Sequence, residues 1–348
     1  MKELFHVQWH ITNLCNLRCK HCYQDDFSMQ NDLDWSGLKK VSDNLLTTIK
    51  EWDKTACIHL TGGEPLLKSE LFSLLNDLDQ NPTVEELGII TNGLLIDQEV
   101  MERLSDNSKL RKIKVSLDGA NAAINDGIRS KGTFDKVMRN LSLIIKEDQF
   151  ETILMFTVMK RNFRSLSSLI KLCRGLGVHG LIIERFIPLG RGRKSMDEVL
   201  SKEEWKELVE TLLGFFPNEG EEHSFLPYQA FQVNFNSKEP ELLGAPCVIG
   251  VDGLCIMPNG DVFPCRRFPI PIGNLLETPL KQIWDESEIL KKIRRKENLK
   301  GECGRCDIKD CRGCRSLALS LTGDSLAEDP CCPYDFHSLL SIGDRFEV

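Results

Sequence analysis

Features common in membrane, secreted and nucleic-acid-binding proteins are missing from this chain of 348 residues. No stretch approaches about 18 consecutive uncharged apolar residues, so no membrane-spanning helix is expected. The opening MKELFHVQWHIT holds no apolar core of signal-peptide length, which favours a cytoplasmic protein. The net charge of −8 and the pI near 5.5 argue against a general nucleic-acid-binding surface.

Short β-rich runs alternate along the chain with amphipathic helical patterns. The six runs predicted as strands span 4–11, 56–61, 86–91, 111–117, 152–159 and 180–187, and helix-period stretches separate them. The predicted helix N-caps are Asp34, Ser69, Asp97 and Thr133. Six such units in series predict an α/β fold with a parallel sheet, either open or an incomplete barrel. Ligands of these folds gather at the carboxyl ends of the strands.

The pattern changes beyond residue 195. A predicted helix at 201–216 leads into a part rich in Pro, Gly and Cys, which has too few apolar runs for a large core. Nine of the 14 cysteines lie between 247 and 332, and clustered cysteines in a reducing compartment favour metal ligation over disulfides. We therefore expect an α/β domain at 1–195, a connecting helix and linker at 196–239, and a small cysteine-rich domain at 240–348 held by metal centres.

The segment NLCNLRCKHC follows the first predicted strand and contains three cysteines, Cys15, Cys19 and Cys22, without a fourth at short range. His21 directly precedes Cys22, so its ring would have to fold back on its neighbour to complete a zinc site. Zinc is the alternative interpretation. The preferred one is a [4Fe–4S] cluster with three thiolate ligands and one iron open to another ligand.

This C-x3-C-x2-C segment, in its place after the first strand, resembles the cluster loop of radical SAM enzymes. The resemblance implies a partial (β/α)6 TIM-like barrel in which S-adenosylmethionine (SAM) chelates the open iron. It further implies that SAM is reductively cleaved to a 5′-deoxyadenosyl radical, which abstracts hydrogen from a substrate, and that a flavodoxin- or ferredoxin-type protein supplies the electron. The resemblance implies no particular catalytic side chain.

Motifs at the ends of later strands agree with this resemblance: TGGEP (61–65), TNG (91–93) and SLDG (116–119). The cofactor-binding residues that it implies are His21, Gly62, Gly63, Glu64, Pro65, Asn92, Ser116, Asp118 and Arg129. Glycines permit close backbone approach, and either Glu64 or free carbonyls would accept from the SAM ammonium. The alternatives are ordinary strand-end turns for the glycine motifs and a surface position for Arg129.

The C-terminal cysteines resemble the SPASM domain of some radical SAM enzymes. Cys247, Gly260 and Cys265 fit its first part, whereas the C-x2-C-x4-C-x2-C run at 303–314 has two spacers one residue short. The resemblance implies two auxiliary clusters, one held by Cys247, Cys255, Cys265 and Cys314, the other by Cys303, Cys306, Cys311 and Cys332. Cys332 is preferred to Cys331 because the family's last cysteine follows Asp-Pro-x. Two structural zinc ions are the alternative.

Arginines follow Cys265, at a position where the sulfatase-maturing branch of the family has an acidic proton acceptor. Oxidation of a Ser or Cys side chain by that route is therefore disfavoured. Arg266 and Arg267 would instead meet a carboxylate or an acidic peptide, unless they are surface residues.

Three functional hypotheses follow. The preferred one is modification of a ribosomally made peptide, with a separate leader-peptide-binding protein as a further partner, because no such domain precedes the first strand. The second is oxidation or decarboxylation of a small molecule or cofactor precursor, such as a tetrapyrrole. The third is an electron-transfer or zinc-binding protein without SAM chemistry, which the pocket motifs at the strand ends disfavour.

Overall fold

The computed structural model describes residues 2–216, 230–236, 240–244, 247–306, 308 and 311–332. Parts of the predicted linker (217–229 and 237–239) and the end of the predicted cysteine-rich domain (333–348) lie outside the described residues. Eleven strands form one sheet in the order β11-β10-β9-β1-β2-β3-β4-β5-β6-β7-β8. The two outermost strands, β11 and β8, are not paired with each other, so the sheet is open.

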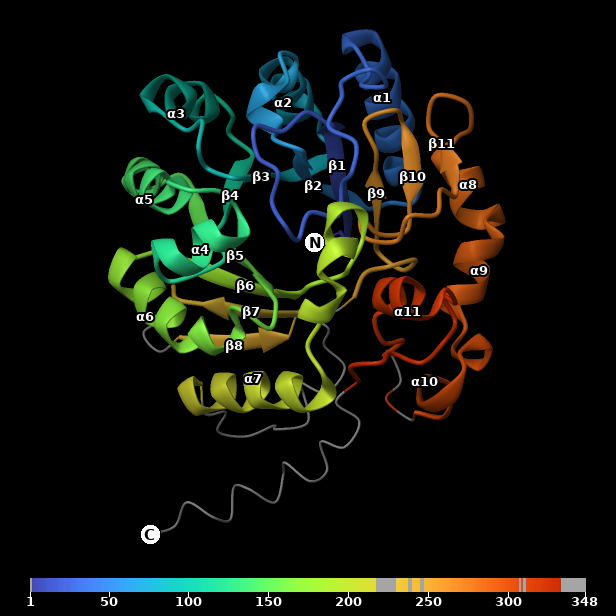
Figure 1. Cartoon of the computed structure of the whole chain (residues 1–348). Helices are drawn as coiled ribbons and strands as arrows, with labels where there is room; N and C mark the ends of the chain where they lie inside the picture. Colours follow the sequence, from blue (N-terminus) through green and yellow to red (C-terminus); the bar gives the residue numbers. More distant parts are fainter. Residues whose placement is uncertain are drawn as a thin grey trace.

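The centre of the sheet consists of six parallel strands in chain order, which confirms the predicted α/β fold. They are β1 (Leu4–Thr12), β2 (Thr55–Gly62), β3 (Val84–Thr91), β4 (Leu110–Ser116), β5 (Glu151–Val158) and β6 (Gly180–Arg185). Helices lie around the outside of this curved sheet (Figure 1). Alternate residues of β1, such as Val7, Trp9 and Ile11, pack in the apolar core with the helices.

Seven helices cover the central strands: α1 (Trp35–Glu51), α2 (Leu71–Gln80), α3 (Gln98–Ser105), α4 (Ala122–Ile128), α5 (Thr133–Ile144), α6 (Leu166–Leu176) and α7 (Lys202–Phe215). Short 3-10 helices add η1 (Pro65–Leu67), η2 (Phe163–Ser165) and η3 (Gly190–Glu198). All of these α-helices except α4 were predicted from the sequence; α4 is only two turns long and ends at Ile128.

The predicted caps are partly right. The carboxylates of Asp34 and Asp97 accept from backbone N–H groups in the first turns of α1 and α3, as predicted. The predictions for Ser69 and Thr133 are wrong by one residue. The Ser69 hydroxyl bonds to the Glu70 carboxylate instead of a helix N–H, and Gly132, with a φ of 81°, turns the chain into α5.

The C-terminal part extends the sheet at both edges. Strands β7 (Ala230–Asn234) and β8 (Glu241–Gly244) add antiparallel to β6, and β9 (Gly253–Ile256) adds parallel to β1. Strands β10 (Asp261–Phe263) and β11 (Gly273–Asn274) complete this edge. Helices α8 (Leu280–Glu286), α9 (Glu288–Arg294), α10 (Gly301–Arg305) and α11 (Arg315–Thr322), with η5 (Lys296–Asn298), follow. The segments with the later cysteines therefore lie beside the central strands.

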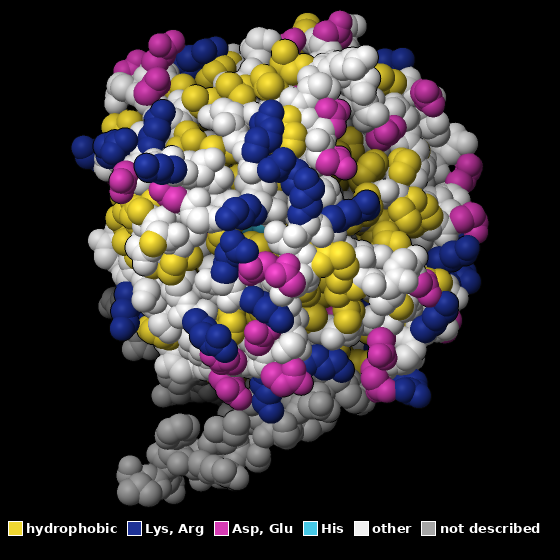
Figure 2. All heavy atoms as spheres, viewed as in Figure 1, with side chains coloured by type: hydrophobic (Ala, Val, Ile, Leu, Met, Phe, Trp, Pro, Cys, Tyr) yellow, Lys and Arg dark blue, Asp and Glu magenta, His cyan; other side chains and the backbone are white. Residues whose placement is uncertain are grey.

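Charged side chains of both signs cover the face seen in Figure 2, with Lys and Arg side chains gathered around its middle and Asp and Glu side chains among them and along the rim. Within the described ranges, no helix is long and apolar enough to cross a membrane.

The inner face of the central strands is unusually polar at one end. Lys114 on β4 is half-buried there, and no hydrogen bond or ion pair within the described part of the chain joins its ammonium to a partner. Burial lowers the pKa of Lys114 from 10.5 to about 8. The protonated form, which still predominates at pH 7, is therefore less favourable in the folded state than in the unfolded chain.

Lys114→Met is expected to stabilise the protein by about 2 kcal/mol at pH 7, because it removes a half-buried, unpaired cation. Between about pH 8 and pH 10.5 the folded wild type releases a proton that the unfolded chain keeps, so its stability should rise with pH there. The Lys114→Met variant should not show this increase of stability with pH. Unfolding midpoints at pH 7, 8 and 9 measure both effects, and a variant less stable than wild type at pH 7 contradicts the account.

Candidate functional site

One cavity lies at the carboxyl ends of the central strands, and all three cysteines of the first motif line it. Its volume is about 130 Å³, and Cys15, Cys19 and Cys22 share its wall with residues from β2 to β6. This is the edge where a parallel α/β sheet collects ligands.

The cysteine loop is held on three sides by backbone hydrogen bonds. The N–H of Gly63, in the loop after β2, donates to Thr12 O at 2.9 Å, while Lys20 N donates to Ile128 O at the end of α4 at 2.9 Å. On the third side Gly192 N, in η3, donates to Cys22 O at 2.9 Å. The three sulfurs are therefore carried by a loop whose backbone is fixed by three separate elements.

The glycine pair after β2 is required by this close approach. A Cβ at Gly63 would lie 2.2 Å from Leu14 O, and a Cβ at Gly62 would lie 2.2 Å from Thr12 O. Gly62 also has a φ of 139°, which side chains other than glycine's rarely permit. Both glycines line the cavity, so their backbone faces any ligand beside the cysteines.

Glu64 lies behind the cavity wall. It is fully buried, and its carboxylate accepts from Thr91 Oγ1 at 2.8 Å, Asn92 N at 2.8 Å and Leu66 N at 3.2 Å. Burial outweighs these hydrogen bonds and raises the pKa of Glu64 to about 7. Both oxygens are therefore used to join the ends of β2 and β3.

Asp118 connects two of the predicted cofactor residues. Its Oδ2 lies 2.6 Å from His21 Nε2 and 2.7 Å from Arg129 Nε, and its Oδ1 accepts from Thr157 N at 3.0 Å. Although burial opposes it, Arg129 and His21 lower the pKa of Asp118 to about 2. Asp118 therefore stays ionised and positions His21 and Arg129, which both line the cavity.

Six of the nine predicted cofactor residues line this cavity and three do not. The six are His21, Gly62, Gly63, Asn92, Ser116 and Arg129, whereas Glu64, Pro65 and Asp118 lie behind the wall. Arg129 is thus not a surface residue. Asn92 Nδ2 reaches Asn16 Oδ1 at 2.8 Å, inside the cysteine loop.

An arginine-rich wall closes the other end of the cavity. Arg266 and Arg267 line it together with Glu184 and Arg185 of β6, so the arginine pair is not on the surface. Glu184 forms ion pairs with both Arg266 and Arg267, and Arg267 Nη1 donates to Arg185 O at 2.7 Å. Since Arg185 is paired with Asp329, one excess positive charge remains at this wall. Such a wall suits a carboxylate.

The cavity is also lined by residues that the sequence did not single out by number: Tyr23, Thr61 of the TGGEP motif, Thr157, and Glu184 and Arg185 at the end of the sixth predicted strand. The signal for the last two is a Glu-Arg pair at the carboxyl end of an otherwise apolar strand, which is costly to bury without a partner. Tyr23 has no such signal.

The later cysteines form two neighbourhoods. In the first, Cys247 lies within electrostatic range of Cys265 and Cys314, and Cys255 within range of Cys265. In the second, Cys311 has Cys303 and Cys306 as neighbours, and Cys332 has Cys303 and Cys311. This grouping agrees with the two sets of four that the SPASM resemblance implies, although Cys331 also lies within electrostatic range of Cys314.

Cys331 lies near Cys314 of the first set rather than near the second set. Its Sγ donates to Leu200 O at 3.1 Å, and it packs in an apolar cluster with Ile187, Leu189 and Leu317. Cys332, beside Cys303 and Cys311, is the better placed of the two for a shared metal centre.

The cysteine sets fit iron–sulfur clusters better than single zinc ions. A tetrahedral zinc ion would hold its sulfurs about 3.8 Å apart. Among the described residues, no three cysteine sulfurs lie within 4.8 Å of one another. Several sulfurs also accept a backbone N–H, as Cys15 does from Leu17 at 3.4 Å and Cys303 from Asp329 at 3.3 Å, which is typical of cluster thiolates. Burial raises the pKa of Cys22 to about 12, so a metal centre is needed to keep such thiols ionised.

Comparisons with known proteins agree with this site. A model of the radical SAM superfamily matches residues 9–173, and a model of the SPASM iron-sulfur cluster-binding domain matches residues 247–307. An AdoMet-dependent heme synthase of Methanosarcina barkeri is 30% identical, covering 94% of this chain and 96% of that protein. The mycofactocin maturase MftC of Mycolicibacterium smegmatis is 28% identical, covering 94% and 82%.

Among solved structures, anSMEcpe with bound AdoMet and a peptide superposes with a TM-score of 0.74 at 19% identity, covering 99% of this chain and 100% of that one. Such a likeness concerns the fold alone. The chain belongs to the radical SAM superfamily. It is a radical SAM enzyme of the SPASM-containing branch, whose cofactors are a [4Fe–4S] cluster with SAM and auxiliary iron–sulfur clusters.

Proposed function

We propose that Cys15, Cys19 and Cys22 hold the [4Fe–4S] cluster and that SAM binds in the same cavity. The cavity-lining residues His21, Gly62, Gly63, Asn92, Ser116 and Arg129 would contact SAM, while Glu64, Pro65 and Asp118 position them. The ion pair with Asp118 fixes the Arg129 guanidinium beside the cysteine loop, where it can meet the SAM carboxylate. When bound, the [4Fe–4S] cluster and SAM would together supply the radical that abstracts a hydrogen atom from the substrate.

The two cysteine neighbourhoods would hold one auxiliary cluster each. The first would use Cys247, Cys255, Cys265 and Cys314, and the second Cys303, Cys306, Cys311 and Cys332. The electrostatic contacts within each set support this division, as does the separate hydrogen bond of Cys331. On this basis the functional parts are a barrel-like domain at 1–195, a connection at 196–239 and an auxiliary-cluster domain at 240–348.

The substrate we infer is a carboxylate-bearing molecule, and the observation that carries this is the arginine wall in the same cavity as the cysteine loop. Arg266 Nε is buried and has no hydrogen-bond partner among the described residues, so it is free to donate to a ligand. A carboxylate here would balance the excess positive charge left by Glu184. The carbons next to the substrate carboxylate would then lie toward Cys15, Cys19 and Cys22.

A tetrapyrrole propionate is the carboxylate that we favour. The similar protein of Methanosarcina barkeri is a heme synthase, and so are two further relatives at 28% and 26% identity, each covering 94% of this chain. Abstraction of one hydrogen from the carbon β to the carboxylate, followed by loss of CO₂ and one electron, would leave an alkene. The electron must pass to an acceptor, and the auxiliary clusters suit that role.

A peptide is the second candidate. The mycofactocin maturase is nearly as similar as the heme synthases, and an acidic side chain or terminal carboxylate would fit the same arginines. In either case we expect a flavodoxin- or ferredoxin-type reductant and a cytoplasmic location. For a peptide substrate, we propose a separate leader-peptide-binding protein as a further partner.

Replacing both Arg266 and Arg267 by glutamine is expected to lower kcat/KM for the carboxylate substrate by about 100-fold, because two charge-assisted hydrogen bonds are lost. SAM cleavage without substrate should persist. The value of kcat/KM is measured with an iron-containing tetrapyrrole as substrate, and mass spectrometry detects the loss of CO₂. A panel of peptides is assayed in parallel. The control is Arg193→Gln, since Arg193 is exposed. An unchanged kcat/KM in the double variant rejects the carboxylate assignment.

A further inference from the structure

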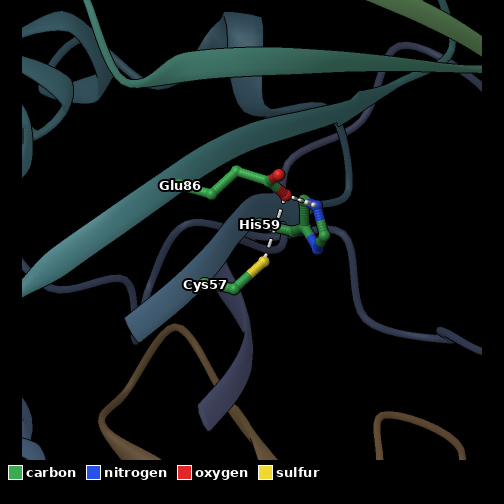
Figure 3. A group of neighbouring side chains, drawn as sticks. All are labelled: Cys57, His59 and Glu86. Carbon is green, nitrogen blue, oxygen red and sulfur yellow. Dashed lines mark hydrogen bonds and ion pairs between the residues drawn. The ribbon is translucent and has the colours of Figure 1, made fainter. Parts of the chain in front are cut away.

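A second group of potential ligands lies on the inner face of the sheet and takes no part in the cavity described above. Cys57 and His59 lie on β2, and Glu86 lies on β3 (Figure 3). One sulfur, one imidazole nitrogen and one carboxylate oxygen come within 4.8 Å of one another. In the part of the chain that the structure describes, no other three His, Cys, Asp or Glu side chains do so.

The sheet register builds this group. Cys57 stands opposite Glu86 across β2 and β3, and its Sγ donates to Glu86 Oε1 at 3.2 Å. His59 stands opposite Gly88, and its ring leans over the glycine so that Nε2 lies 3.9 Å from the same oxygen. A Cβ at Gly88 would come within 2.2 Å of His59 Cδ2. The absence of a side chain there is what allows the ring to reach this position.

His59 presents a free nitrogen to the group. The residue is only 9% exposed, and its Nε2 has no hydrogen-bond partner among the described residues. A neutral imidazole offers a lone pair at such a nitrogen. A buried polar atom without a partner is costly, which indicates that something else occupies this place.

We propose that Cys57, His59 and Glu86 form a binding site for a divalent cation of the zinc type. A thiolate, a neutral imidazole and a carboxylate are ligands that zinc prefers, and the two negative charges balance the ion. Zinc at about 2.0–2.3 Å from its ligands separates the ligand atoms by about 3.3–3.8 Å, close to the spacing already present. Binding releases the Cys57 proton to solvent.

Lys112 controls the affinity of this site. Its ammonium lies 2.7 Å and 3.0 Å from the two Glu86 oxygens and must move when a cation binds. His6 on β1, which stands opposite Cys57, and the ammonium of Lys114 also face the group. The site therefore carries a competing positive charge, and removal of Lys112 should strengthen metal binding.

The test is zinc binding by the full-length protein with its iron–sulfur clusters reconstituted, measured by competition with a chromophoric chelator. Wild type is expected to bind about one zinc per chain. Cys57→Ser and Glu86→Gln should each weaken binding at least tenfold, and Lys112→Met should strengthen it about tenfold. Cys173→Ser is the matched control, because Cys173 is a buried cysteine on α6 outside the group.

A gain of affinity in Lys112→Met cannot arise from misfolding, so it separates a metal site from a structural defect. Zinc X-ray absorption of the loaded wild type should show one sulfur and otherwise nitrogen or oxygen ligands. Equal zinc binding by wild type, Cys57→Ser and Glu86→Gln overturns the proposal. So does a zinc shell of three or four sulfurs, which would mean that the ion sits in a cysteine set.

Discussion

Replacing Cys15, Cys19 and Cys22 together by alanine is expected to abolish 5′-deoxyadenosine formation and to remove about four of about twelve irons per chain. All three sulfurs line the cavity, and the loop that carries them is fixed by backbone hydrogen bonds that the substitutions leave in place. The fold and both later cysteine neighbourhoods should therefore survive. Anaerobic reconstitution, iron analysis and chromatography of the nucleoside after reaction with dithionite and SAM provide the measurement.

Single substitutions at the end of the chain give a matched control. Cys331→Ala should keep all the iron, because the Cys331 thiol bonds to Leu200 O, whereas Cys332→Ala should lose iron from the second neighbourhood. If the triple variant keeps its iron or still forms 5′-deoxyadenosine, the assignment of the first motif is wrong.

Asp329→Ala is expected to destabilise the protein by about 3–5 kcal/mol, because it leaves the buried Arg185 unpaired. Asp329 bridges the barrel and the cysteine-rich part: its carboxylate lies 2.8 Å and 3.0 Å from Arg185 Nη1 and also accepts from the backbone N–H of Cys314 and of Cys331. Its own N–H donates to the Cys303 sulfur. Loss of the Asp329 carboxylate should also weaken the positioning of Cys303, Cys314 and Cys331.

The measurement is the unfolding midpoint under anaerobic conditions, together with retained iron. The midpoint should fall by about 5–15 °C, and part of the iron should be lost. The control is Glu207→Ala, which removes the partner of Arg164 in an exposed ion pair and should leave the unfolding midpoint nearly unchanged. Equal effects of the two substitutions would show that the Asp329 bridge does not join the two parts.

The central parallel strands could be predicted because they alternate with helical stretches, and the strand ends gave the place of the site. The edge strands could not. β9 is four residues long and pairs with β1, whose sequence lies about 250 positions away. No local pattern in Gly253–Ile256 indicates that partner, because sheet edges are chosen by packing rather than by short-range sequence.

The identity of the site residues was easier to predict than the direction of their side chains. Glu64 stands in the expected motif, yet its carboxylate turns inward to Thr91 and Asn92. Arg266 and Arg267 could not be told from surface arginines, because their place depends on β10 pairing with β9 and on the segment after β10 reaching β6. Asp329 gave no signal either, since its partner Arg185 comes from a different part of the chain.

The most direct test of the account is transfer of deuterium from a carboxylate-bearing substrate to SAM-derived 5′-deoxyadenosine. A tetrapyrrole deuterated at the propionate carbon β to the carboxylate is incubated anaerobically with the reconstituted enzyme, SAM and reductant. We expect deuterium in 5′-deoxyadenosine together with loss of CO₂, both greatly reduced in the Arg266/Arg267 double variant. Unlabelled 5′-deoxyadenosine from the wild type, with the substrate bound and unchanged, would contradict it.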